Sequence, residues 1–339
     1  MPTVFVPQSI RLFTAAMLIA VAAPAPVPAH AAERLVFGLD WVAEAEQGGF
    51  FQAQATGIYE RYGLEVEIRP GGPQVNNKIL LAAGKLDLAM LANSLEPVAA
   101  VAEGVPLVAV AAFMQKDPIA LMAHEGAGID GLGDLAGHPL FLSDNARISF
   151  WRWLQKSYGL EEEMVRPYTY NLQPWLADPQ AVVQAYATNE PFLAREAGAR
   201  PRVLLLADQG WPTYAAVVTA RRETVEERGA VIQRFIDASI EGWHDFLEGD
   251  PEPAFAAIAA MNPDMPRAIM EFGRQAMIER GIVDSGDAKK LGLGAMTDER
   301  WQALARVLLE TGIYASDPGV ERAYTLEFVN RGAGTSAGP

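Results

Sequence analysis

The residues best suited to chemistry in this sequence are aromatic and amide side chains at expected loop positions. Aromatic faces stack on a flat ligand at little entropic cost, amides offer paired donors and acceptors, and a carboxylate accepts from an N–H edge. Together they predict a binding site for a flat, polar small molecule. The candidates are Trp41, Gln74, Asn76, Asn93, Asn145, Asn171, Trp175, Trp211 and Tyr214, with Glu190 as an isolated carboxylate.

The tryptophans divide into two groups by their expected positions. Trp151, Trp153, Trp243 and Trp301 recur within helical apolar stripes, which is typical of core residues. Trp41 and Trp211 follow expected strands instead. We therefore expect no binding role for the first group.

Motifs for catalysis, metals and cofactors are weak or missing in this sequence. The glycines of 126–131 satisfy G-x-G-x-x-G, but Gly133, Gly137 and Pro139 interrupt the helix that a dinucleotide site requires. The sequence contains no H-E-x-x-H motif and no cysteine, which excludes a thiolate metal site and a lipid attached through cysteine. We expect no cofactor, no metal and no catalysis, although a carboxylate pair for hydrolysis remains open.

The N-terminal residues 1–31 read as a signal peptide. Residues 12–23 form an apolar run too short to span a bilayer, and Ala29-His30-Ala31 fits a small-x-small cleavage site. The Pro-rich segment that follows the run has no stop-transfer charges, which disfavours an uncleaved anchor. The net charge of −15 disfavours nucleic acid as a partner. We expect a soluble periplasmic protein cleaved near Ala31.

The candidate residues need elements to position them, and 34–70 supplies the first set. Alternating apolar residues predict a strand before Trp41, a helical stripe follows, and Leu64, Val66 and Ile68 alternate again. This is a βαβ unit. In such sheets the loop after the first strand faces the ligand crevice, so Asp40 and Trp41 should lie there.

The same rhythm continues to a change of composition at 125–137, where we expect a second domain to begin. Within it, Asp178-Pro179 has the residue types that begin a helix, and we expect a helix from there through Tyr186. Strands are expected at 203–206 and 214–219, and helices fill most of the remainder. Residues 331–339 read as a disordered low-complexity tail.

Four segments resemble a known family. They are LDWVAEAEQGGFFQAQATGIYERYGLEVEIRPGG, LLAAGKLDLAM, VAAVAEGVPLVAVAAFMQKDPIALMAH, and the AYATNEPF run of 185–192. In this order they resemble the substrate-binding proteins of ABC importers for thiamine pyrimidine precursors, which are related to the sulfonate, taurine and nitrate binders. Members often have Pro-Asn-x-x-His after the Asp-Trp pair, whereas this chain has VAEAEQ at 42–47.

The resemblance implies an α/β fold of the type II periplasmic binding protein class, with a ligand cleft between two lobes. Lobe 1 would be 32–125 and 213–330, and lobe 2 would be 126–212. The resemblance also implies that Trp41 and Glu190 lie near the cleft. It implies a monomer that delivers a small planar nitrogen-containing solute, such as a pyrimidine or thiamine precursor, to an inner-membrane ABC permease.

Three alternatives remain open from the sequence. A small anion such as an alkanesulfonate or nitrate could bind at helix N-termini near Gly48-Gly49 and Asn145, with Arg147 as a further donor. A secreted enzyme could use Glu190. The same fold could also report a ligand to a membrane receptor instead of delivering it.

Overall fold

The computed structural model describes residues 1–4 and 32–332. Met1–Ala31 and Ala32–Pro339 form separate units, and every helix and strand of the described residues belongs to the second unit. Residues 5–31 of the predicted signal peptide and 333–339 of the predicted tail lie outside the described residues. Among the described residues, no helix is long and apolar enough to cross a membrane.

The first sheet has five strands in the order β2-β1-β3-β10-β4. β1 is parallel to β2 and β3, whereas β10 runs antiparallel to both of its neighbours. The parallel strands therefore end at one edge of the sheet. The strands are β1 (Glu33–Gly38), β2 (Leu64–Arg69), β3 (Leu88–Asn93), β4 (Leu107–Met114) and β10 (Ala215–Arg221).

The second sheet repeats this arrangement in the order β7-β6-β8-β5-β9. β6 is parallel to β7 and β8, and β5 is the antiparallel strand that corresponds to β10. In each sheet, the antiparallel strand is the first strand that the chain forms after it crosses from the other sheet. The strands are β5 (Ile119–His124), β6 (Leu140–Leu142), β7 (Val165–Pro167), β8 (Val182–Tyr186) and β9 (Pro201–Leu205).

Two expectations change at this point. The predicted helix from Asp178 through Tyr186 is wrong, because Val182–Tyr186 is the strand β8, held between β5 and β6. Residues 119–124, which we expected in lobe 1, pair with β8 and β9 in the second sheet. The lobe boundaries remain a prediction, and this pairing favours a first crossing before β5.

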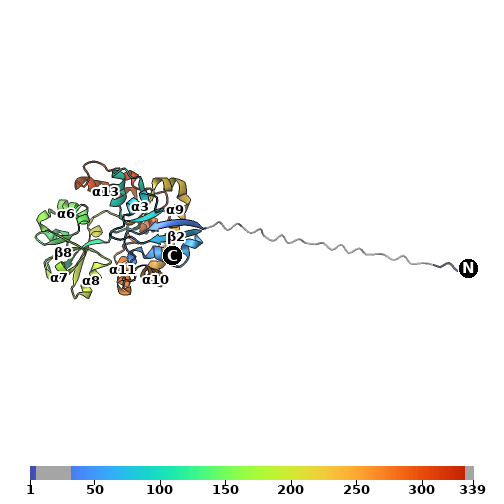
Figure 1. The fold of residues 1–339 in the computed structure, drawn as a ribbon, viewed down its shortest axis with the longest axis horizontal. Helices are drawn as coiled ribbons and strands as arrows, with labels where there is room; N and C mark the ends of the chain where they lie inside the picture. Colours follow the sequence, from blue (N-terminus) through green and yellow to red (C-terminus); the bar gives the residue numbers. More distant parts are fainter. Residues whose placement is uncertain (5–31, 333–339) are drawn as a thin grey trace. The chain divides into compact units, whose positions relative to one another are not determined.

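Helices cover both sheets, and Figure 1 shows α6, α7 and α8 around β8. The predicted single helix of the opening unit is broken in two at Gly57, whose φ of 70° is left-handed. The first-sheet helices before the crossing are α1 (Gly48–Ala55), α2 (Ile58–Arg61), α3 (Asn77–Ala82) and α4 (Leu95–Ala102), with the 3₁₀ turn η1 (Ala45–Gln47).

The second sheet has short helices between its strands, and longer helices follow β10. The former are η2 (Leu132–Leu135), α5 (Asp144–Arg147), α6 (Phe150–Tyr158), η3 (Glu162–Met164), α7 (Gln173–Ala177), α8 (Glu190–Glu196) and η4 (Leu206–Gln209). The latter are α9 (Arg222–Glu248), α10 (Glu252–Met261), α11 (Arg267–Glu279), α12 (Ala288–Leu291), α13 (Asp298–Glu310) and η5 (Val320–Arg322).

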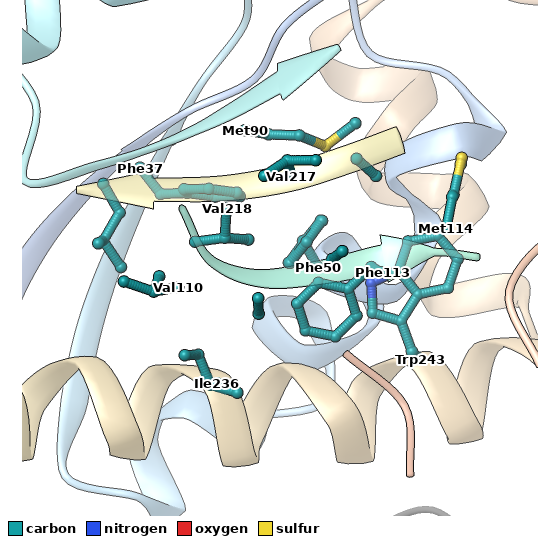
Figure 2. Packing of buried hydrophobic residues seen from close by; sticks show 14 of the residues in the cluster. Phe37, Phe50, Met90, Val110, Phe113, Met114, Val217, Val218, Ile236 and Trp243 are labelled. Carbon is teal, nitrogen blue, oxygen red and sulfur yellow. The ribbon is translucent and has the colours of Figure 1, made fainter. Parts of the chain in front are cut away.

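The main core lies between α9 and the first sheet. Figure 2 shows Ile236 and Trp243 of α9 pointing toward the strands, with Phe50 and Phe113 beside Trp243. The Phe50 ring meets Trp243 edge-on at 5.7 Å and Phe113 at 5.0 Å. Trp243 is fully buried, which confirms its expected place in the core.

Gly48 and Gly49 let α1 lie directly against α9. A Cβ on Gly48 would come within 2.2 Å of the Phe246 ring, and one on Gly49 within 2.2 Å of the Trp243 ring. Any larger residue would push the two helices apart. These glycines therefore serve close packing.

The two chain segments that cross between the sheets are fastened together by Arg300 of α13. Its guanidinium donates to the carbonyl oxygens of Pro212 at 3.0 Å and Thr213 at 2.8 Å in one segment, and to that of Gln115 in the other. The Thr213 hydroxyl also donates to Asp117 at 2.9 Å. Both crossings are thus held by one side chain and one carboxylate.

Candidate functional site

A cavity of about 420 Å³ lies between the two sheets, and both contribute to its walls. The first sheet contributes the loops after β1 and β2, the start of α3 and the end of β3. The second sheet contributes α5, the loop after β7, β8 and the start of α8. Ligand pockets typically measure about 300–1,000 Å³, so the cavity can hold a small molecule.

The parallel strands of each sheet direct their carboxyl ends toward this cavity, as expected for open α/β sheets. Buried Asn77 holds the first edge together, because its amide donates to the Leu39 carbonyl at 2.6 Å and to the Met90 carbonyl at 3.4 Å. Gln47 secures the adjoining loop by accepting from the Glu44 N–H at 2.9 Å and donating to Asp40 at 3.2 Å. The loop after β1 is therefore held in one conformation.

Two aromatic rings enter the cavity wall from opposite sheets. The Trp41 and Tyr170 ring centroids are 6.4 Å apart, and Tyr168 lies 5.4 Å from Tyr170. Tyr170 has a φ of 61°, a left-handed conformation that is uncommon outside glycine and concentrates at functional sites. The residue is 60% exposed, so its position is not explained by core packing.

Carboxylates dominate the charge of the cavity. Five acidic side chains line it against a single lysine, Lys78. Within residues 32–332, none of the five forms an ion pair with a basic side chain. The acidic residues are Asp40, Glu44, Glu46, Glu96 and Glu190.

Neutral donors hold these carboxylates in place, and several of the donors come from the opposite sheet. Glu46 accepts from the Thr188 hydroxyl, and Glu44 accepts from the Asn189 amide at 3.4 Å. Glu190 accepts from the Tyr186 N–H at 2.7 Å and from the Tyr168 hydroxyl at 3.4 Å. The acidic cluster therefore spans the junction of the two sheets.

Burial shifts the titration of this cluster toward the protonated form. It raises the pKa of Asp40 to about 7, and the Gln47 hydrogen bond opposes the rise. Burial also holds the pKa of Glu44 well above its usual range, and the charges of Glu46, Asp40 and Glu190 add to the effect. The pKa values of Glu46, Glu96 and Glu190 are raised, again chiefly by burial.

Four of the predicted site residues line the cavity: Trp41, Asn76, Asn145 and Glu190. The Asn76 side chain caps α3 by accepting from the Ile79 N–H at 3.1 Å. Asn145 lies on α5, next to the Ser143 cap. Their binding roles remain predictions, but the structure brings them together.

The other six lie outside the cavity lining. Asn93 and Asn171 accept from nearby backbone N–H groups at the starts of α4 and α7, and Gln74 lies in the exposed loop after β2. Trp175 stacks on His124 at 3.8 Å, and Trp211 packs against Trp153 at 5.4 Å. Both tryptophans are core residues of the second sheet.

Tyr214 belongs to the crossing segment instead. Its hydroxyl donates to Asp287 at 2.7 Å, and the guanidinium of Arg300 lies 4.0 Å from its ring centroid. The ring is almost fully buried. It therefore helps to fasten the two sheets together.

Sequence reasoning missed the acidic residues Glu44 and Glu46 and the ring of Tyr170. Asp40 was placed at the crevice but not given a binding role. Glu44 and Glu46 could have been predicted from the sequence, because both lie in the loop after β1, which was expected to face the crevice. Tyr170 lies directly before Asn171, but nothing in its sequence context separates an exposed ring from a buried one.

The fold is shared by solved periplasmic binding proteins. The aliphatic sulphonate binding protein SsuA from Escherichia coli superposes with a TM-score of 0.64 at 17% identity, over 86% of this chain and 91% of SsuA. The desulfurization enzyme DSZB superposes with a TM-score of 0.55 at 14% identity, over 88% of this chain and 98% of DSZB. The molecule has the two-lobed type II periplasmic binding protein fold, with a ligand cleft between the lobes.

The profile of the NMT1/THI5-like family matches residues 44–254. The chain belongs to this family, which confirms the resemblance seen in the sequence. A Haemophilus influenzae protein whose name assigns it to thiamine biosynthesis is 28% identical over 251 residues, which is 70% of this chain and 76% of that protein.

Proposed function

We propose that this protein is the periplasmic solute-binding component of an ABC importer. It captures a small planar nitrogen-containing solute in the cleft and presents the closed form to an inner-membrane permease. The observation that carries the proposal is the cavity between the lobes, whose walls come from both sheets. A ligand touching both lobes stabilises the closed conformation, and the permease can then distinguish loaded from empty protein.

The lining favours a flat nitrogen-containing ligand. Trp41 and Tyr170 offer ring faces, while Asn76, Asn145 and Gln184 offer amide groups that recognise ring nitrogens and exocyclic amines. The thiamine-related name of the Haemophilus relative agrees with a pyrimidine-like solute. Delivery to a permease requires no turnover, so the protein acts as a carrier.

The alternative is a small anion, as the name of the sulphonate-binding neighbour suggests. Of the groups expected to hold it, only Asn145 lines the cavity, and the others are engaged elsewhere. Arg147 is paired with Glu162 and does not line the cavity, and Gly48 and Gly49 are packed under α9. This arrangement favours the nitrogen-containing solute.

The experiment is native mass spectrometry of the mature protein purified from its own periplasm, followed by identification of the released ligand. A thermal-shift panel of pyrimidines, flavins, alkanesulfonates and nitrate accompanies it. An intact nitrogen heterocycle that stabilises the protein is expected. Stabilisation by an anion alone would contradict the proposal, and chemical conversion of the ligand would indicate an enzyme, as DSZB is named.

A further inference from the structure

We propose that the solute binds as a cation, with its positive charge seated among Glu44, Glu46 and Glu190 where the lobes meet. This inference rests on the proposed function and specifies the chemical class of the ligand. It assigns two parts to the solute. A flat part lies against Trp41 and Tyr170, and a cationic part lies at the acidic cluster.

The first argument is the charge of the cavity. Five carboxylates line it, only Lys78 opposes them, and in residues 32–332 no basic side chain pairs with any of the five. Buried acidic groups in proteins are normally paired or neutralised, because desolvating an isolated charge is costly. A cationic ligand would supply the missing partner.

The second argument is the position of the cluster. Glu44 is 9% exposed and Glu46 5% exposed, and both lie in lobe 1. Their hydrogen-bond donors, Asn189 and Thr188, lie in lobe 2 directly before Glu190. A cation at this point would be contacted by carboxylates of both lobes, so its binding would favour closure.

The third argument concerns what holds the cluster before a ligand arrives. Hydroxyl and amide groups supply only part of the hydrogen bonds that a carboxylate can accept. Burial raises the pKa of all three groups, and the charges of neighbouring carboxylates add to this rise for Glu44 and Glu190. A cation would stabilise the ionised form of these carboxylates, which burial disfavours.

A metal ion is a poorer occupant than an organic cation. Among the described residues, no group of three or more histidine, aspartate or glutamate side chains is arranged to hold a metal. The Trp41 and Tyr170 rings offer ring faces to the flat part of an organic ligand, and a hydrated metal ion would not use them. The geometry therefore favours a protonated amine or amidine attached to a flat ring.

The test is isothermal titration calorimetry with two matched aminopyrimidines, one with an aminomethyl and one with a hydroxymethyl substituent. At neutral pH the first is a cation and the second is neutral. We expect the amine to bind at least about tenfold more tightly, since hydrogen bonds to charged groups are the stronger ones. Glu44→Gln should remove most of that preference while leaving the affinity for the alcohol nearly unchanged.

Control measurements separate the possible failures. Glu103→Gln, at the exposed position directly after α4, should keep the full preference for the amine. Equal affinity for amine and alcohol, or a Glu44→Gln variant that keeps the preference, would overturn the cation inference and leave the proposed function standing. Binding of an alkanesulfonate with no response to either pyrimidine would overturn both.

Discussion

The indole of Trp41 and the phenol of Tyr170 face each other across the cleft, with ring centroids 6.4 Å apart and ring planes inclined by 41°. Trp41 follows β1 of lobe 1, and Tyr170 follows β7 of lobe 2. The distance between the two rings therefore depends on how the two lobes are placed relative to each other. A flat ligand that contacts both rings couples its own binding to closure of the lobes.

Removal of either ring should weaken ligand binding more than it weakens the fold. We expect Trp41→Ala and Tyr170→Ala each to lower affinity for the natural ligand by about tenfold, because an aromatic contact contributes about 0.5–1.5 kcal/mol beyond its buried area. Titration calorimetry measures the affinity, and thermal unfolding of the empty protein measures the fold. Trp41→Phe should restore most of the affinity. Full affinity in both alanine variants would contradict a role for the ring pair.

The acidic cavity should make the empty protein less stable as the pH rises. The folded-state pKa of Asp40 is raised from 3.8 to about 7, so the folded state binds its proton more tightly than the unfolded state does. The stabilisation from this proton is complete below 3.8 and is lost as the pH rises through about 7. Glu44, Glu46, Glu96 and Glu190 act in the same direction, and Lys78 and Gln47 oppose them.

The measurement is the melting temperature of ligand-free protein at about pH 5 and about pH 8. Asp40→Asn mimics the protonated form, so this variant should lose less stability over the interval than the wild type does. Asp264→Asn, at an exposed loop position, should keep the wild-type dependence. An Asp40→Asn protein with the wild-type dependence would show that Asp40 does not titrate as described.

The hydrogen bonds of Arg300 to the two crossing segments should control both the stability of the protein and the motion of one lobe relative to the other. Arg300→Met leaves the carbonyl oxygens of Gln115, Pro212 and Thr213 without this donor, and each buried acceptor left unpaired costs about 1–3 kcal/mol. We expect a clear drop in melting temperature and a wider distribution of lobe separations by small-angle X-ray scattering. Arg306→Met, at an exposed position of the same helix, is the matched control. Equal melting temperatures and equal lobe separations in the two variants would show that Arg300 does not hold the crossing segments together.

The glycine pair at the start of α1 should be intolerant of side chains. Gly49→Ala places a methyl group 2.2 Å from the Trp243 ring, and overpacking of this kind costs about 1–3 kcal/mol. Chemical denaturation should show this loss. Gly133→Ala has open space around its new Cβ and should change stability little. A neutral Gly49→Ala would mean that α1 and α9 can separate without cost.

The βαβ opening and most later strands could be predicted from sequence because their apolar residues alternate or recur with clear periods. The prediction of a helix through Tyr186 was wrong for a physical reason. Asp178-Pro179 resembles a helix start, but β-branched Val182 and Val183 pair with both neighbours in the middle of a sheet. Tertiary pairing outweighed the local signal.

Four of the ten residues predicted for the site line the cavity, and their binding roles remain predictions. Trp41 and Glu190 reached the cavity because each follows a parallel strand whose end faces the cleft. Trp211 is also near a strand end, but Trp153 covers it from a helix that the sequence alone does not place. The negative charge of the cavity arises because Glu44 and Glu190 come together from different lobes. A local sequence pattern cannot predict a contact between residues so far apart in the chain.

The exchange of antiparallel strands between the sheets also affects the order of folding. Every strand of the second sheet lies within 119–205, so that lobe can form once this continuous stretch is available. The first sheet must wait for β10, which lies between β3 and β4 and is the last strand of residues 32–332. Chains generally fold as units from local to distant contacts. The inserted lobe should therefore fold first, and the lobe that begins the described fold should be completed last.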